Sequence, residues 1–337
     1  MARSNAGKDS SPNSNQPLDA ITDFLEEPDN YPEPTGKVTV KDTHLSRVFL
    51  TDDYVYKLKK SLRYDFLDFS SLQARLRNCE TEVVINSELA PSVYQGVVVL
   101  AQGGSGGFEL GGSGEPVDYL VKMRRLPDSA NLEAQLEDGG PDRAEVDAAA
   151  TRLARFYRDR PVAGGVDPEH YRSLCRERRD ELRDLPLSPG DDLDRLHDRL
   201  QRALRDHGDA LARRHRVDVH GDLRPQHVYL GEDPVFIDRL EFNSELRLLD
   251  PVEELVFFQL ECQRLSHGWV GERFLRTYCE LSGDQPPQWL PGLYQGYRGL
   301  LWALLSARHL ERNDTRKPWA EIARDYLRRG LAAMKED

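Results

Sequence analysis

The sequence contains little cysteine and no long hydrophobic run. Its four cysteines, Cys79, Cys175, Cys262 and Cys279, are spread over 337 residues and form no C-x-x-C pair. This pattern argues against a zinc knuckle or a disulfide framework and is typical of a reducing cytoplasm. No apolar stretch approaches the roughly 18–20 residues of a membrane span, and the N-terminal MARSNAGKDSSPNSNQ lacks the apolar core of a secretory leader. We therefore expect a cytoplasmic protein without a membrane segment.

Positive charge is scarce relative to negative charge. The 46 Lys and Arg residues face 58 Asp and Glu residues, so the formal net charge is -12 at pH 7. Such a balance disfavours a protein whose main role is to wrap nucleic acid. The basic run at residues 213–216 ends a predicted helix, where cations are favoured in any case. We expect no nucleic-acid partner.

Hydrophobic patterning divides the chain into a tail and two lobes. Residues 1–36, rich in Ser, Asn, Pro and Asp, predict a disordered tail with about one helical turn at 20–25. Residues 37–126 predict three short strands, a helix over 70–89, and two more strands joined by a glycine-rich segment at 103–114. Residues 127–337 predict helices, including 141–160 and 191–215, and one β-hairpin. This order indicates an α+β protein with a small antiparallel β lobe and a larger, mainly helical lobe.

The glycine-rich segment imitates a phosphate-binding loop. Seven glycines lie between residues 103 and 114, but no helix begins after them. A phosphate-binding glycine loop delivers its ligand to a helix N-terminus. We therefore expect a flexible hairpin tip here.

Two acids flank the predicted hairpin of the second lobe. Asp222 ends His220-Gly221-Asp222, and Asp238 follows the strand V-F-I, with a turn at 231–234 between the strands. A hairpin of this length brings both carboxylates to one end of the ladder. One can then receive a hydroxyl proton while the other holds a divalent metal, for which magnesium is the natural choice. Taken singly, each acid could instead be an ordinary turn residue.

The motifs of this region resemble those of a known family. H-G-D-x-x-x-x-H followed by V-F-I-D is similar to the catalytic and metal-binding motifs of the aminoglycoside phosphotransferase and choline kinase group. V-Y-K-L-K-K, F-L-D-F-S and L-E-F-N resemble a bacterial branch of that group, some members of which carry a P-loop ATPase domain. This chain contains no G-x-x-x-x-G-K-[ST]. The resemblance implies a protein-kinase-like two-lobe fold, with residues 37–126 binding nucleotide and residues 127–337 providing catalysis and substrate binding.

For the second lobe, the resemblance implies several roles. Asp222 matches the catalytic Asp that orients the acceptor hydroxyl and accepts its proton, and His220 belongs to the same catalytic motif. Asp238 matches the metal-binding Asp. Arg224 lies two positions after Asp222 and could reach the γ-phosphate as a fixed positive charge. Asp250, before Pro251, is expected to cap a helix and to support the catalytic loop.

The first lobe offers two candidate lysines. Lys57 matches the strand lysine that neutralises the α- and β-phosphates, but Lys59 points to the same strand face and competes with it. Both could also be solvated lysines of a charge run. Glu82 matches the helix glutamate that pairs with the lysine, ahead of Glu80, and could alternatively be a surface acid.

The nucleotide loop departs from the family pattern. Residues 42–46 replace a glycine-rich turn, so backbone amides and the hydroxyls of Thr43 and Ser46 are the groups left to approach phosphates. The adenine is expected against the backbone at 123–125, beginning at Met123.

Position 227 departs further, because His227 stands where the wider family has an Asn metal ligand. Imidazole is a poor ligand for magnesium and a better one for manganese or zinc. Several interpretations follow: the metal depends on Asp238 and water, His227 contacts phosphate, His227 is a packed core residue, or catalysis is weak.

These residues indicate an ATP-dependent phosphotransferase that moves the γ-phosphate to a small-molecule hydroxyl, with ATP and Mg²⁺ (or Mn²⁺) as cofactors. One alternative is a weak or inactive kinase-like regulator that binds nucleotide. Another is a metal-dependent hydrolase using Asp222, Asp238, His220 and His227. The oligomeric state is left open.

Acidic residues after the metal motif bear on the acceptor. They fit a cleft for a cationic substrate, such as an aminoglycoside, or equally a set of exposed helix acids. The residues are Glu241, Glu245, Glu253, Glu254 and Glu261.

Overall fold

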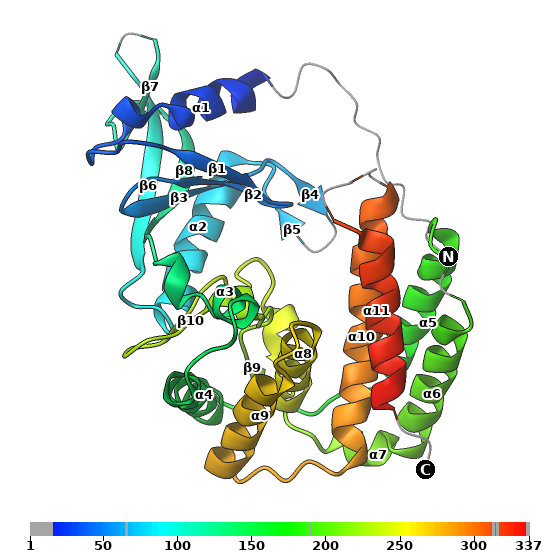
Figure 1. Cartoon of the computed structure of the whole chain (residues 1–337). Helices are drawn as coiled ribbons and strands as arrows, with labels where there is room; N and C mark the ends of the chain where they lie inside the picture. The colour runs from blue at the N-terminus through cyan, green and yellow to red at the C-terminus, as the bar shows by residue number, and fades with distance from the viewer. Residues whose placement is uncertain are drawn as a thin grey trace. The chain divides into compact units, whose positions relative to one another are not determined.

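The structure, a computed structural model, describes residues 16–64, 67–104, 106–188, 190–311, 314 and 317–334, with side chains from residue 19 onward. The chain divides into two compact units, and the division along the sequence falls between Arg125 and Leu126. This boundary lies one residue from the one expected between the two lobes. Elements of both units are labelled in Figure 1.

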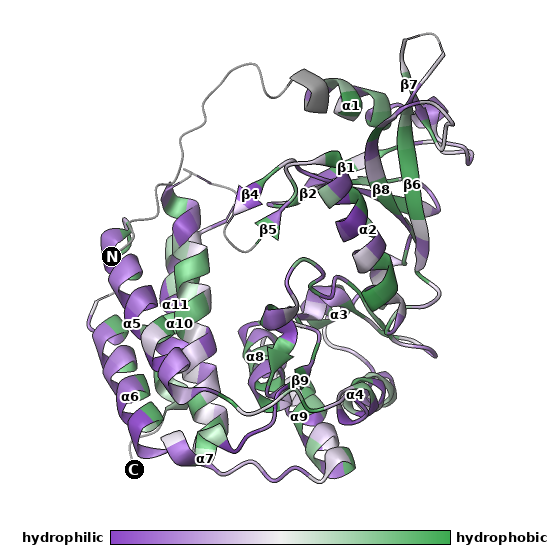
Figure 2. Cartoon of the chain, turned by 180° about the vertical axis from the view of Figure 1, so that it is seen from behind, coloured by the Kyte–Doolittle hydropathy of each residue, from purple (hydrophilic) through white to green (hydrophobic). Residues whose placement is uncertain are grey.

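The first unit is built on a six-stranded antiparallel sheet in the order β1-β2-β3-β8-β6-β7. Runs such as V-V-V-L make β6 one of the most hydrophobic strands in Figure 2. A separate small hairpin pairs two further strands, β4 and β5. The strands are β1 (Thr39–Asp42), β2 (Ser46–Leu50), β3 (Tyr54–Lys59), β4 (Arg63–Tyr64), β5 (Leu67–Asp68), β6 (Tyr94–Gln102), β7 (Phe108–Leu110) and β8 (Pro116–Arg124).

One helix of the first unit, α2 (Leu72–Ser87), packs against β6 and β8. It begins where the Ser71 side chain accepts a hydrogen bond from the Ala74 amide at 3.1 Å, as expected of a serine N-cap. Arg75 Nε donates to both carboxylate oxygens of Asp118 on β8, at 2.9 and 3.1 Å. This buried contact fixes the rotation of α2 and therefore the direction of its side chains.

The expectation of a disordered tail is wrong for residues 16–36. Helix α1 (Gln16–Glu26) and a short 3-10 turn (Pro28–Asn30) pack on the sheet, and Ile21, Leu25 and Tyr31 are buried in the same core as strand residues of β2 and β3. Residues 21 and 25 are one helical turn apart and therefore share a face. The sheet supplies the apolar partner that this short, polar segment lacks by itself. Residues 1–15 lie outside the described residues.

The glycine-rich segment also contains more structure than expected. An additional edge strand, β7, follows its first glycines and pairs with β6. Gly106 and Gly111, at φ of 89° and 76°, adopt the left-handed conformation that the turns on either side of β7 require.

The second unit is mainly helical, and short β-strand pairs interrupt its helices. The expected helix over 191–215 is divided at His207 into α6 and α7, and residues 161–190 contain a full helix, α5. The helices are α3 (Leu132–Glu137), α4 (Arg143–Arg158), α5 (Pro168–Asp184), α6 (Asp192–Asp206), α7 (Gly208–Ala212), α8 (Pro251–Arg264), α9 (Gly268–Ser282), α10 (Trp289–Glu311) and α11 (Trp319–Ala333). The strands are β9 (Val217–Asp218), β10 (Val228–Tyr229), β11 (Val235–Phe236) and β12 (Leu248–Leu249).

Helices α10 and α11 lie side by side in both views (Figures 1 and 2). Their close approach depends on glycine: a Cβ on Gly299 would lie 2.8 Å from the Tyr326 carbonyl oxygen. Among the helices in the described part of the chain, none has both the length and the apolar composition that crossing a bilayer requires.

Candidate functional site

The β10–β11 hairpin brings together three of the five side chains that the sequence predicts for the site of the second unit: Asp222, His227 and Asp238. Val228 pairs with Phe236, and the Ile237 amide donates to the His227 carbonyl oxygen at 2.9 Å, so the ladder continues toward the two acids. His227 lies between them. Its Nδ1 is 2.8 Å from the Asp222 carbonyl oxygen and 3.7 Å from Asp222 Oδ2, while its Nε2 is 3.9 Å from Asp238 Oδ2.

Asp222 carries its negative charge beside a fixed cation. Arg224 Nη2 donates to Asp222 Oδ2 at 3.0 Å. Burial by itself raises the pKa of Asp222, but the positive charge of Arg224, followed by electrostatic interactions with the rings of His227 and His220, outweighs burial and holds the pKa below its usual value. Asp222 is therefore ionised at neutral pH and accepts hydrogen bonds.

The guanidinium of Arg224 is held on its other side by α10. It lies over the ring of Trp302, 4.9 Å from the centroid. Aromatic faces attract cations at this distance. The arginine is thus positioned by a carboxylate and an indole, and it lies beside Asp222.

Asp238 has an unusual backbone. Its φ of 60° places a non-glycine residue in the left-handed region, and its side chain is 41% exposed. Such conformations cost free energy of about 1–3 kcal/mol and concentrate at functional sites. The fold therefore holds this carboxylate in a direction that an ordinary turn would not give it.

His220, which was expected to belong to the catalytic motif, is completely buried. Its Nε2 lies 2.9 Å from the Ile237 carbonyl oxygen, so the proton of the neutral ring is on Nε2 and ties the loop to the residue before Asp238. Burial, with the neighbouring His227, lowers its pKa to about 3. The next residue, Gly221, has φ of 91°, and a Cβ there would lie 3.0 Å from atoms of Leu240 and Arg247.

Glu254 is the residue that sequence reasoning missed as a support of the catalytic loop. One carboxylate oxygen accepts the His220 amide at 3.1 Å and the other accepts the Gly221 amide at 2.5 Å, while Tyr157 donates its hydroxyl. Burial raises the pKa of Glu254, and the hydrogen bond from Tyr157, which lowers the pKa, offsets only part of this effect. Its position one helical turn after Asp250 was the available signal.

The interpretation of the acidic residues needs correction for three of them. Glu253 and Glu254 are each 1% exposed and Glu261 is 9% exposed, so they are neither exposed helix acids nor free acids of an acceptor cleft. Glu253 pairs with Arg298 at 2.7 Å, and Glu261 accepts the Tyr326 hydroxyl at 2.7 Å. These carboxylates connect α8 to α10 and α11.

Asp250 is confirmed as the N-cap of α8. Its Oδ1 accepts the Val252 amide at 3.0 Å, and its Oδ2 accepts Arg214 Nε at 2.7 Å and the Tyr294 hydroxyl at 2.9 Å. The direct support of the catalytic loop that we expected from Asp250 comes from Glu254 instead.

In the first unit, both candidate lysines of β3 contact the expected glutamate of α2. Lys57 Nζ lies 2.8 Å from Glu82 Oε1, and Lys59 forms an ion pair with Glu82 Oε2. The interpretations that treated the lysines as solvated and Glu82 as a surface acid are wrong, because their side chains are 12%, 1% and 0% exposed.

The two residues expected in the nucleotide loop, Thr43 and Ser46, form hydrogen bonds with each other within the β1–β2 turn. Thr43 Oγ1 donates to the Ser46 carbonyl oxygen at 2.8 Å and accepts the Ser46 amide at 3.0 Å, and Ser46 is buried. The Thr43 hydroxyl therefore closes the β1–β2 turn.

The segment expected to meet adenine is also hydrogen-bonded. Met123 lies on β8 between Val55 of β3 and Tyr94 of β6. The amides of Arg124 and Arg125 donate to the Val93 and Asp53 carbonyl oxygens at 2.7 and 2.8 Å. These two amides are thus already used within the first unit.

The side chains of the second unit suit a metal ion that is bound mainly by the phosphates of a nucleotide and by water. Among the described residues, no group of three or more His, Cys, Asp or Glu side chains has the arrangement of a metal site. Mg²⁺ commonly binds one or two carboxylates together with phosphate and water oxygens. Asp238 fits that requirement as an accessible oxygen donor, whereas His227 offers nitrogen.

Comparison with known proteins gives both sequence relatives and structural neighbours. No protein-family model matches the chain. Two curated relatives, the uncharacterized proteins Rv2004c of Mycobacterium tuberculosis and Mb2027c of Mycobacterium bovis, are each 30% identical over 309 residues. The match covers 88% of this chain and 59% of each relative, so the chain spans under two thirds of their length.

Three solved structures are similar over almost their entire length. The GDP and kanamycin complex of APH(2")-IIia has a TM-score of 0.58 at 18% identity, covering 93% of this chain and 98% of that one. A choline/ethanolamine kinase family protein from Mesorhizobium loti has a TM-score of 0.57 at 15% identity (94% and 95% covered). The choline kinase LicA from Streptococcus pneumoniae has 0.56 at 14% identity (89% and 94% covered). The chain has the protein-kinase-like fold of aminoglycoside phosphotransferases and choline kinases.

The expected α+β architecture and the resemblance inferred from the motifs are confirmed at the level of this protein-kinase-like fold. Identities of 14–18% leave catalytic activity and substrate to be argued from the residues.

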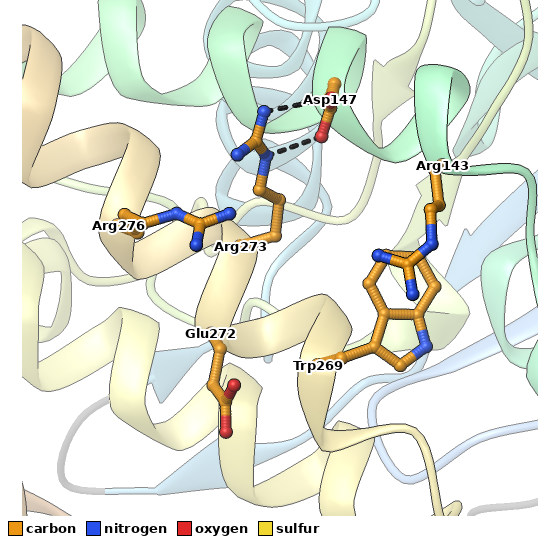
Figure 3. Close-up of a pocket in the computed structure, with 6 residues that line it drawn as sticks. All are labelled: Arg143, Asp147, Trp269, Glu272, Arg273 and Arg276. Atoms are coloured by element: carbon orange, nitrogen blue, oxygen red, sulfur yellow. Dashed lines mark hydrogen bonds and ion pairs between the residues drawn. The ribbon is translucent and has the colours of Figure 1, made fainter.

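One hollow of about 300 Å³ lies elsewhere in the helical unit of this protein-kinase-like fold, between α4 and α9 (Figure 3). Arg273 pairs with Asp147 through two contacts, and the Arg143 guanidinium stacks on Trp269 at 4.6 Å. The hollow contains none of the motif residues, so we assign it no part in the chemistry. Its lining residues are Arg143, Asp147, Trp269, Glu272, Arg273 and Arg276.

Proposed function

We propose that the protein is an ATP-dependent phosphotransferase that moves the γ-phosphate to a hydroxyl of a small molecule. The observation that carries the proposal is the grouping of an ionised Asp222, His227 and a backbone-strained Asp238 at one end of the hairpin. The fold neighbours support it, since one of them is a complex with GDP and kanamycin and another is a choline kinase.

Asp222 acts on the acceptor. Its carboxylate accepts a hydrogen bond from the acceptor hydroxyl, and the hydroxyl oxygen forms a bond to the γ-phosphorus as the bond to the bridging oxygen of ADP breaks. The proton passes to Asp222. A base with a lowered pKa is weak, which suits a reaction in which positioning contributes more than early proton removal.

The remaining residues manage phosphate charge. Arg224 provides a permanent cation two residues from the base, and Lys57 provides the ammonium for the α- and β-phosphates. Asp238 would hold the divalent ion, which neutralises phosphate charge when it is bound.

The acceptor is proposed only as a small molecule that carries a hydroxyl group. Burial of Glu253, Glu254 and Glu261 removes the strongest sequence argument for a cationic acceptor.

An ATP-consumption assay over a panel of hydroxyl compounds, with Mg²⁺ and separately with Mn²⁺, tests the proposal. We expect one compound class to stimulate consumption and to gain a phosphate detectable by mass spectrometry. Absence of transfer with either metal, while nucleotide still binds, would contradict it.

A second candidate, a nucleotide-binding regulator with little transferase activity, is favoured by one observation. His227 places an imidazole, 3.9 Å from Asp238, where the wider family has an oxygen ligand. Retained nucleotide binding without product in the same assay would support this candidate.

A further inference from the structure

We propose that Lys59 is a positioning residue for the nucleotide phosphates: it holds Glu82 so that Glu82 orients Lys57. The proposal rests on the proposed use of nucleotide and adds a residue whose role the family resemblance leaves open.

The geometry gives each lysine its own oxygen. Lys57 and Lys59 are two positions apart on β3 and therefore point to the same face of the sheet. Lys57 contacts Glu82 Oε1, and Lys59 pairs with Glu82 Oε2. A carboxylate held through both oxygens cannot rotate without losing one of these contacts.

Burial separates the two lysines. The Lys59 side chain is 1% exposed and its ammonium lies 5.5 Å from the Phe69 ring centroid, whereas Lys57 is 12% exposed. A buried ammonium without a counter-ion is costly, so Lys59 keeps its contact with Glu82 when a ligand arrives. Lys57 is the lysine with the larger surface for a phosphate to contact.

The strand end that carries Lys59 is itself anchored. The Lys60 amide donates to the Leu45 carbonyl oxygen at 2.9 Å, and Lys60 Nζ lies 2.8 Å from Asp42 Oδ2. The β1–β2 turn therefore fixes the residue that follows Lys59, and Glu82 is held against a rigid point of the sheet.

Calorimetric binding of adenosine, ADP and ATP with Mg²⁺ tests the proposal, because the ratio of adenosine and ATP dissociation constants isolates the phosphate contribution. We expect Lys57→Met to reduce this ratio about tenfold or more and Lys59→Met to reduce it about three- to tenfold, with adenosine affinity unchanged. Lys59→Arg should restore part of it. Lys41→Met, an exposed lysine on β1 of the same sheet, is the matched control.

A double-mutant cycle then separates positioning from a merely structural role. If Lys59 acts through Glu82, Lys59→Met should have no further effect on the ratio in a Glu82→Gln background. A lower melting temperature with an unchanged ratio would overturn the proposal. So would a ratio lost in Lys59→Met but kept in Lys57→Met, which would make Lys59 the phosphate-binding lysine.

The outcomes also distinguish this proposal from the proposed function. Nucleotide binding without transfer to any acceptor contradicts the function, yet still allows the ratio to be measured. A parent protein that binds no adenine nucleotide contradicts both. Lys59→Gln, which keeps a polar group beside Glu82, replaces Lys59→Met if the latter does not fold.

Discussion

At the scale of single residues, two acids with different surroundings divide the proposed work. Asp222 is held by Arg224 and stays ionised, whereas Asp238 has a left-handed backbone and a partly exposed side chain. Substitutions at these positions should therefore have different consequences.

Asp222→Asn should retain nucleotide binding and reduce transfer by about 10²–10⁴-fold, the usual contribution of a positioned acid–base group. Asp238→Ala should also lose the dependence of nucleotide binding on Mg²⁺. Calorimetry with and without Mg²⁺, together with product formation, measures both effects. Asp233→Asn, an exposed acid of the same hairpin, is the control. An Asp222→Asn variant as active as the parent would show that the base is misassigned.

His227→Asn should increase the apparent affinity for Mg²⁺ in nucleotide binding, because an amide oxygen replaces an imidazole beside Asp238. Titration of Mg²⁺ at fixed nucleotide concentration measures this affinity, with Mn²⁺ as the comparison. A weaker response to Mg²⁺ in the variant would indicate that His227 acts by packing on Asp222.

His220 should make the native state less stable in mild acid. In the unfolded chain this histidine takes up a proton near pH 6.5, whereas in the native state its pKa is about 3. Between these values the unfolded chain binds more protons, so stability falls as the pH falls through this window, by about 2 kcal/mol from pH 7 to pH 5. Urea unfolding at both pH values should show a smaller loss for His220→Gln than for the parent or for the exposed control His170→Gln. Equal losses would refute the assignment.

At the scale of elements, helix α8 supports the loop at residues 220–222. Its N-cap Asp250 and the buried Glu253 and Glu254 of its first turn bind two arginines, three tyrosine hydroxyls and two loop amides. Glu254 satisfies the buried amides of His220 and Gly221, which would otherwise lack this partner.

Glu254→Ala should destabilise the second unit by about 3–5 kcal/mol, because it leaves two amides and a tyrosine hydroxyl unsatisfied. Glu254→Gln, which retains the shape, should cost less and still reduce activity. Urea unfolding and hydrogen exchange at residues 220–222 measure the two effects. Glu245→Ala, an exposed acid, should change neither, and an equal effect from it would contradict the role of Glu254.

At the scale of the whole molecule, each unit has its own core. Helix α1 is part of the first core, since Leu25 is completely buried among residues of the sheet. Leu25→Ala should lower stability by about 2–5 kcal/mol, and hydrogen exchange should show lost protection within residues 16–125 only. The exposed Asp19→Ala is the control. Equal loss of protection in the second unit would contradict separate cores.

The sequence by itself determined the main elements of the first unit's sheet, its helix α2 and the acids at the hairpin of the second unit. Strands at 39–59, the helix over 72–87 and the placing of Asp222 and Asp238 on either side of His227 follow from local periodicity and turn residues, which act between near neighbours in the chain. The sequence allowed Lys57, Lys59 and Glu82 to be named as candidates. It did not allow the prediction that both lysines contact the one carboxylate of Glu82, because 23 to 25 residues separate the lysines from it.

Only the tertiary structure decided which polar residues are buried and whom they contact. In the sequence, Glu254 and Glu82 are indistinguishable from surface acids, and α1 resembles a polar tail. In the structure, elements far away in the sequence supply the partners that bury them. Burial depends on contacts between segments that are far apart in the sequence. The net charge of -12 therefore does not indicate which of the carboxylates are buried.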